Sequence, residues 1–246
     1  MSFNNTTSNN PTLVCVPCFS GAPWQLEKLA PLTGRPMATM RLPEDLSTVE
    51  EYADFVAQEV SDLDSYVLAG DSFGAVIVLD VATRNPRGLR GLVLSGGFAS
   101  NPLPVWKGLA ARASRLAAGP LYRQGILRFH AYQLASKFDV TGEVPHTQKD
   151  YRDLFIENTP RRSYTSRVTS VIRFDVREFL PKIAVPTLLI TPEDDKIVGP
   201  EASNDLLVGL PLAREIVLPH TGHMFRFTHP NLYGQTIADF LDHGIA

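Results

Sequence analysis

The stretch that decides the fold of this chain is Tyr66-Val-Leu-Ala-Gly-Asp-Ser-Phe-Gly74, an apolar run that enters a Gly-x-Ser-x-Gly motif. An apolar strand followed by this motif is typical of a nucleophile elbow, a sharp turn between strand and helix that exposes a serine hydroxyl. Glycines at both flanks remove side chains that would collide across the turn, and they tolerate its backbone angles. The motif arises by chance in roughly one chain in ten of this length, so Ser72 becomes a candidate nucleophile only if the rest of the chain supports it.

Short apolar runs alternate with amphipathic stretches on both sides of this motif. The runs lack polar alternation, as expected for strands covered on both faces. We expect strands at residues 12–16, 37–41, 65–69, 89–95, 187–191 and 214–218. We expect helices at residues 47–63, 73–84, 201–208 and 231–242, the first of which opens on a capping box formed by Ser47 and Glu50. Strand–helix repetition predicts an α/β fold with a largely parallel, doubly wound sheet of about six strands.

The segment from 101 to 177 differs from its surroundings because it contains no strand-like run. Its Leu, Ala, Tyr and Arg residues recur at helical spacing and predict helices at 106–117, 121–135, 147–158 and 162–172. We therefore expect an all-helical lid at 101–177, inserted into a core made of residues 12–100 and 178–246. Residues 1–11 are polar and are expected to form a disordered lead-in.

The formal net charge of −3 conceals an asymmetry between these parts. The 101–177 segment has 13 Lys and Arg against 6 Asp and Glu, whereas the remainder has 10 against 20. Either the segment faces an anionic partner, or its helices use arginine on solvated faces. No apolar stretch approaches the ~20 residues of a membrane span, and the N-terminus lacks the pattern of a signal peptide. We expect a cytoplasmic protein with no membrane or nucleic-acid partner.

Two cysteines, Cys15 and Cys18, form a Cys-x-x-Cys pair. A redox pair would need a thiolate at a helix N-terminus, but Cys15 lies inside the apolar run of residues 13–16. A zinc site would need a second pair of ligands, which the sequence does not supply. We therefore interpret Cys15 as a small buried apolar residue.

A serine nucleophile needs a base, and the base needs an acid to orient it. Three histidines, His220, His223 and His229, follow the last expected strand. We favour His223 as the base because Gly222 allows a tight turn beside it; His220 is the alternative, and His229, before a proline, is interpreted as a helix-entry residue. His130, His146 and His243 are assigned structural roles.

The candidate acid follows the strand at 187–191, in the run Glu193-Asp194-Asp195. Charge runs are usually solvated loops, but this one sits where an open α/β sheet binds ligands, at the carboxyl end of a strand. We favour Asp195, with Asp194 as the alternative.

An oxyanion hole needs two hydrogen-bond donors. The backbone N–H of Phe73, next to the serine, is one candidate. The loop after the first strand supplies the second, for which we favour the N–H of Phe19, while the Ser20 hydroxyl could add a contact to substrate.

The order Ser72, Asp195, His223, with helices inserted between the fourth strand and the acid, resembles the α/β-hydrolase superfamily in its lid-bearing serine esterase branch. The resemblance runs from residue 13 to the C-terminus. The chain departs from it in two places. Pro17-Cys18 stands where most relatives have His-Gly, and only about eleven residues precede the first strand, so we expect no antiparallel edge hairpin.

The resemblance implies a carboxylesterase-like reaction through an acyl-enzyme on Ser72, without metal or organic cofactor. It also implies an apolar lid over a small-molecule ester, with substrate-binding residues Trp106, Leu109, Leu121, Tyr122 and Ile126. Similar enzymes include pimeloyl-acyl-carrier-protein methyl ester esterases, so Arg112, Arg115, Arg123 and Arg128 are candidates for binding an acidic carrier. The superfamily also contains carbon–carbon bond hydrolases and lyases with the same triad, and proteins that only bind ligands.

Overall fold

The computed structural model describes residues 10–23, 26–102 and 148–245, together with positions 109, 113, 125, 128 and 143. In this part of the chain, six strands form one sheet with the order β2-β1-β3-β4-β5-β6, and all neighbours are parallel. The strands are β1 (Thr12–Val16), β2 (Met37–Thr39), β3 (Tyr66–Asp71), β4 (Leu89–Ser95), β5 (Thr187–Pro192) and β6 (Ala213–Leu218). The predicted fold class is confirmed, with β2 ending earlier and β3 later than expected.

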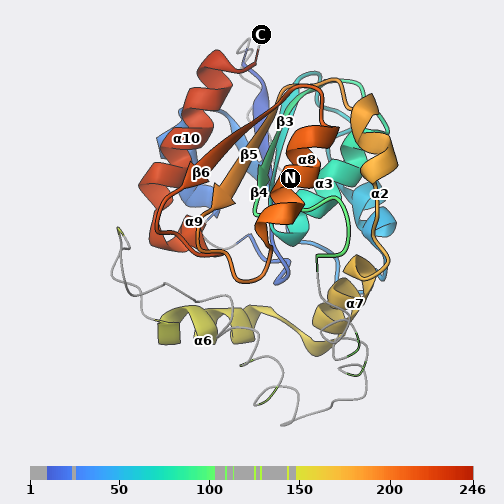
Figure 1. The fold of residues 1–246 in the computed structure, drawn as a ribbon, viewed down its shortest axis with the longest axis vertical. Coiled ribbons are helices and arrows are strands. Elements are labelled where there is room, and N and C mark those ends of the chain that lie inside the picture. The colour runs from blue at the N-terminus through green and yellow to red at the C-terminus, as the bar shows by residue number, and fades with distance from the viewer. Residues whose placement is uncertain are drawn as a thin grey trace.

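Helices cover both faces of the sheet, as Figure 1 shows. On one face lie α2 (Val49–Glu59), α3 (Phe73–Thr83) and α8 (Pro200–Gly209), and on the other lie α1 (Ala30–Thr33) and α10 (Pro230–His243). Successive side chains of a strand point to opposite faces. Val14 of β1 therefore joins the first core and Leu13 the second.

The start of α2 corrects one detail of the sequence reading. The capping box is formed by Thr48 and Glu51, one residue later than predicted for Ser47 and Glu50. Thr48 Oγ1 accepts from the Glu51 N–H at 3.1 Å, and Glu51 Oε2 accepts from the Thr48 N–H at 3.0 Å. Both Ser-x-x-Glu and Thr-x-x-Glu fit the pattern, and the sequence alone does not separate two overlapping matches.

Four short helices were not predicted. They are η1 (Leu26–Leu29), α1, η4 (Arg177–Lys182) and α9 (Phe225–Thr228). None of them is long enough to show helical periodicity in the sequence. No helix in the described residues has both the length and the apolar character needed to cross a bilayer.

Two helices of the inserted segment are described, α6 (Gln148–Asn158) and α7 (Arg161–Val171), close to the predicted 147–158 and 162–172. They lie beyond the carboxyl ends of the strands (Figure 1). Backbone pairing joins the two ends of the segment, because the Asn101 N–H donates to the Phe174 carbonyl at 3.2 Å and the Val176 N–H to the Ala99 carbonyl at 2.9 Å. The predicted helices at 106–117 and 121–135, and most of the lead-in, lie outside the described residues.

Candidate active site

Ser72 occupies a strained turn between β3 and α3. Its φ of 54° and ψ of −110° are rare for a residue with a side chain. The turn is possible because both flanking glycines pack against backbone: a Cβ at Gly70 would lie 2.3 Å from the Gly74 carbonyl oxygen, and one at Gly74 would lie 2.2 Å from that of Val16. The sequence thus builds a tight elbow that holds the Ser72 hydroxyl at the carboxyl end of the sheet.

His223, in the loop after β6, contacts this hydroxyl. Its Nε2 lies 2.8 Å from Ser72 Oγ, and its Nδ1 lies 2.6 Å from Asp195 Oδ2. Burial lowers the pKa of His223, but the charge and hydrogen bond of Asp195 outweigh it, so the pKa is raised above its usual value. With the proton of the neutral ring on Nδ1, Nε2 can accept the serine proton.

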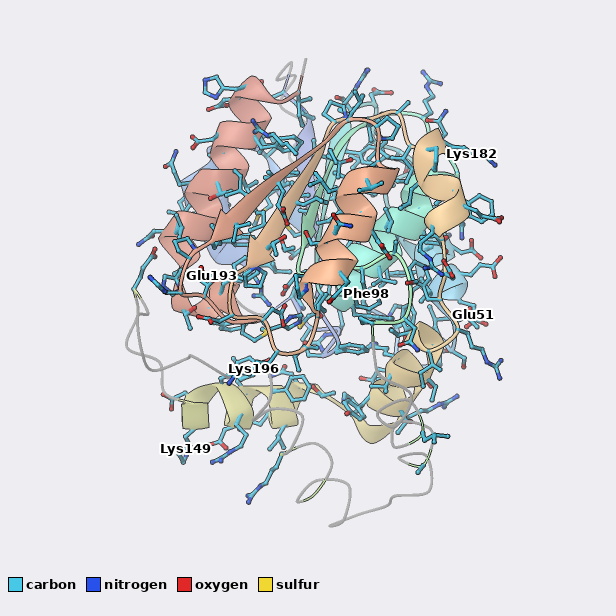
Figure 2. All side chains as sticks on the ribbon, viewed as in Figure 1. Glu51, Phe98, Lys149, Lys182, Glu193 and Lys196 are labelled. Carbon is cyan, nitrogen blue, oxygen red and sulfur yellow. The ribbon has the colours of Figure 1, made fainter. Side chains whose placement is uncertain are left out.

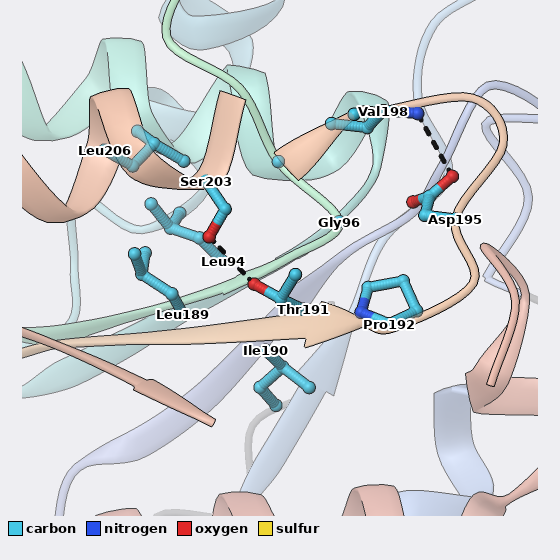
Figure 3. A pocket seen from close by; sticks show the side chains of 12 residues that line it. Leu94, Gly96, Leu189, Ile190, Thr191, Pro192, Asp195, Val198, Ser203 and Leu206 are labelled. Carbon is cyan, nitrogen blue, oxygen red and sulfur yellow. Dashed lines mark hydrogen bonds between the residues drawn. The ribbon is translucent and has the colours of Figure 1, made fainter. Parts of the chain in front are cut away.

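Asp195 follows β5, and its two oxygens have different partners. Oδ2 contacts His223, while Oδ1 accepts from the backbone N–H groups of Ile197 at 2.8 Å and Val198 at 3.0 Å. Figure 3 shows the contact with Val198 beside a cavity of about 10 Å³, which has room for about one water and not for a substrate. The structure therefore brings Asp195, and not Asp194, to the histidine.

The other histidines of the cluster lie elsewhere. His220 is exposed, with its Nδ1 3.6 Å from Glu193 Oε2. His229 is the N-cap residue of α10, as expected, and its Nδ1 lies 2.7 Å from Thr228 Oγ1. Among the described residues, Glu193, Asp194 and His220 form the one group with metal-ligating atoms within 4.8 Å of each other. Exposed acidic groups of this kind are common without an ion.

The candidate oxyanion donors lie on neighbouring segments. Phe73 begins α3, and Phe19 lies in the loop after β1, hereafter the oxyanion loop (residues 17–23). Their rings stack with centroids 4.9 Å apart and planes inclined by 16°. The Ser20 hydroxyl is buried, and it accepts from the Ala22 N–H at 3.3 Å within the same loop.

A buried ion pair beside the serine was not found from the sequence. Arg226 Nε donates to Asp71 Oδ2 at 2.8 Å, across 155 residues of chain. Both side chains are buried. Burial lowers the pKa of Arg226, but its neighbours, Asp71 foremost, together raise the pKa above its usual value. Asp71 precedes the nucleophile and Arg226 follows the base by three positions. The pair therefore joins the end of β3, next to Ser72, to α9, which follows His223.

The two cysteines are free and buried, as predicted for Cys15. Burial raises the pKa of Cys15 to about 12 and also raises that of Cys18. Both thiols therefore stay protonated near neutral pH, which disfavours redox chemistry.

The predicted lid contacts are only partly described. Leu109 is 60% exposed and Arg128 is exposed. The remaining residues lie outside the described part of the chain: Trp106, Leu121, Tyr122, Ile126, Arg112, Arg115 and Arg123. An apolar cluster that the sequence reading did not name packs α6 and α7 against the residues after His223, and it contains Tyr151, Phe155, Tyr164, Val168, Met224 and Phe227.

Comparison with known proteins places this geometry among hydrolases. The model of the serine aminopeptidase S33 family matches residues 31–226. A proposed carbamate hydrolase, RutD, of Pseudomonas savastanoi pv. phaseolicola is 27% identical over 214 residues, which cover 83% of this chain and 80% of that protein. A pimeloyl-[acyl-carrier protein] methyl ester esterase of Neisseria meningitidis is 28% identical over 201 residues, covering 79% and 75%. The solved structure of a thermophilic esterase from Thermogutta terrifontis, with malate bound, has the same fold, with a TM-score of 0.82, 19% identity, and coverage of 100% and 94%.

Proposed function

The chain belongs to the serine aminopeptidase S33 family of α/β hydrolases, and we propose that it cleaves carboxylic esters of small to medium acyl groups through an acyl-enzyme on Ser72. One observation carries this proposal. Ser72, His223 and Asp195 form an unbroken chain of contacts at 2.8 Å and 2.6 Å at the carboxyl end of the sheet. A nucleophile, a base and an orienting acid in that order are the requirements of acyl transfer.

The reaction begins when Ser72 Oγ bonds to the carbonyl carbon while its proton passes to His223 Nε2. The carbonyl oxygen becomes negative, and the N–H groups of Phe73 and Phe19 would hold it. Asp195 stabilises the protonated imidazole and keeps its ring oriented. His223 then gives the proton to the departing alcohol oxygen as the carbon–oxygen bond breaks. Water repeats these steps on the acyl-enzyme and releases the carboxylic acid.

The test uses p-nitrophenyl butyrate and a fluorophosphonate probe. Ser72→Ala should lower kcat by at least about 10³-fold and abolish labelling, because the proposed acyl-enzyme and the probe both form a bond to Ser72 Oγ. Ser61→Ala is the matched control, since Ser61 is exposed and bonds only to the Gln58 carbonyl. Unchanged turnover in Ser72→Ala would refute the proposal. Labelled but ester-inactive wild-type protein would point instead to another bond, such as the carbon–carbon bond of related hydrolases.

A carrier-bound acyl substrate is the second candidate, favoured by the charge of the inserted segment. Its excess of 13 basic over 6 acidic residues contrasts with the acidic remainder. Lys149 on α6 is exposed and points away from the core (Figure 2). A relative is a pimeloyl-[acyl-carrier protein] methyl ester esterase. The test compares hydrolysis of an ester bound to an acyl carrier protein with hydrolysis of free p-nitrophenyl butyrate. Changing Arg112, Arg115, Arg123 and Arg128 to Glu should impair the first reaction and spare the second. Equal loss on both would exclude this candidate.

A further inference from the structure

We propose that Arg167, on α7 of the inserted segment, is a positioning residue that holds the oxyanion loop in its working conformation. This inference rests on the proposed function. It assigns a role to a side chain that touches neither Ser72 nor His223, and it links the inserted helices to the reaction.

The contacts of Arg167 join three separate segments of the core. Its Nη1 donates to the Phe19 carbonyl at 2.8 Å. Its Nη2 donates to the carbonyls of Pro43 at 3.0 Å and Leu42 at 3.4 Å. Its Nε donates to the Tyr52 hydroxyl at 3.2 Å. A planar guanidinium with its donors in a fixed fork can serve these acceptors together, which the single ammonium of lysine cannot.

The burial of Arg167 is costly and therefore calls for an explanation. The side chain is 1% exposed, and the ion pairs found among the described residues do not include it. Its acceptors there are three carbonyls and a phenol, which are dipoles and not charges. A buried cation without a carboxylate is an expensive way to join helices, whereas it is an effective way to fix the direction of several carbonyls.

The oxyanion loop is shaped around this guanidinium. Gly21 has a φ of +71°, and a Cβ there would lie 2.4 Å from Nη2 of Arg167. The Gly21 carbonyl accepts from the Leu42 N–H at 2.8 Å, so the loop and the segment that shares Arg167 are also bonded to each other. The left-handed backbone at position 21 and the close approach of the guanidinium both favour glycine there.

The same contacts surround both candidate oxyanion donors. Arg167 fixes the carbonyl of Phe19, whose ring stacks on Phe73. Tyr52 packs edge-on against Phe73 with centroids 5.3 Å apart, and Arg167 lies 5.5 Å from the centre of the Tyr52 ring. Oxyanion donors must sit within a few tenths of an ångström of their ideal place. Through these contacts with Phe19 and Tyr52, Arg167 sets the distance between the N–H groups of Phe19 and Phe73.

The experiment measures kcat and KM for p-nitrophenyl butyrate, per active site titrated to completion, and the affinity for a trifluoromethyl ketone that forms a tetrahedral oxyanion on serine. Arg167→Lys should lower kcat by about 10- to 100-fold with KM changed by less than about threefold. The affinity for the ketone should fall by a similar factor, because its oxyanion is held by the same N–H groups of Phe19 and Phe73. Tyr52→Phe, which removes one acceptor and is less disruptive if Arg167→Lys folds poorly, should lower kcat several-fold.

Arg162→Met is the matched control, because Arg162 is an exposed arginine on the same helix. It should leave kcat and ketone affinity unchanged. A purely structural role for Arg167 would reduce the titrated sites and leave kcat per site intact, and that result overturns the inference, as does wild-type kcat in both Arg167→Lys and Tyr52→Phe. Absence of ester turnover in the wild type would refute the proposed function instead.

Discussion

The elbow and the oxyanion loop lie at the ends of adjacent parallel strands, yet they are held in opposite ways. The elbow is encoded locally: two glycines within four residues of each other let β3 turn into α3. The oxyanion loop is held by Arg167, which is 148 residues from Phe19. We therefore expect the proposed nucleophile to be positioned by nearby sequence, and the proposed donors to the tetrahedral oxyanion to be positioned by a distant helix. If so, a change in α7 would alter catalysis without disturbing Ser72.

The largest expected effect comes from breaking the local side of this comparison. A Cβ in Gly70→Ala would lie 2.3 Å from the Gly74 carbonyl oxygen, only four residues along the chain. That oxygen belongs to the backbone of the first turn of α3, which cannot move aside without opening the elbow. We expect a loss of about 4 kcal/mol or more in the free energy of unfolding, measured by urea denaturation, or failure to obtain folded protein.

Gly199→Ala is the control for that change. Its Cβ would meet only the carboxylate end of Glu201, a flexible side chain, so stability should change by less than about 1 kcal/mol. Equal stability of the two variants would show that the elbow does not depend on its glycine. The statement that nearby residues determine the elbow would then be wrong.

The same contrast explains what the sequence could and could not predict. The strands, α3, α8 and α10 follow from runs of residues close together in the chain. The proximity of Ser72, Asp195 and His223 was also predicted, because all three follow strands and the carboxyl ends of parallel strands meet at one edge of the sheet. Arg167 and Arg226 were missed because arginine side chains usually lie at the solvated surface. Only tertiary structure, with partners 115 and 155 residues away, reveals that these two are buried.

The next largest effect concerns the Asp71–Arg226 pair. Asp71 lies beside Ser72 in the elbow, and its partner is 155 residues away in the chain. Removing one partner leaves an uncompensated buried charge, so Arg226→Met should cost about 3–5 kcal/mol of stability. The double variant Asp71→Leu/Arg226→Met should be less destabilised than the sum of the two single variants. Urea denaturation of all four proteins gives the interaction energy.

Arg214→Met is the control for this cycle, because Arg214 is exposed, lies over the Phe240 ring, and belongs to β6 at the edge of the sheet. It should combine additively with Asp71→Leu. Additivity in the Asp71–Arg226 cycle as well would mean that the pair does not hold the end of β3 and α9 together. A large interaction energy would mean that Ser72, like the oxyanion loop, depends on a distant contact. Its turn is formed locally, but its position relative to His223 would depend on Arg226.

The smallest expected effect is a shift in the pH dependence of kcat/KM, and it concerns His223. Its partner Asp195 is 28 residues away in the chain, farther than the glycines of the elbow and nearer than Arg167 is to Phe19. Catalysis needs neutral His223, so kcat/KM should rise with pH as the ring loses its proton, with a midpoint above 6.5 because its pKa is raised. Asp195→Asn should move the midpoint to lower pH, since the lowering of the His223 pKa by burial then outweighs the remaining influence of the Asp71 charge. Asp194→Asn, whose parent residue does not contact the histidine, should leave the midpoint in place. A midpoint that stays fixed in Asp195→Asn would mean that Asp195 does not raise the pKa of His223, and the contact between the loop after β5 and the loop after β6 would then not control the protonation of the ring.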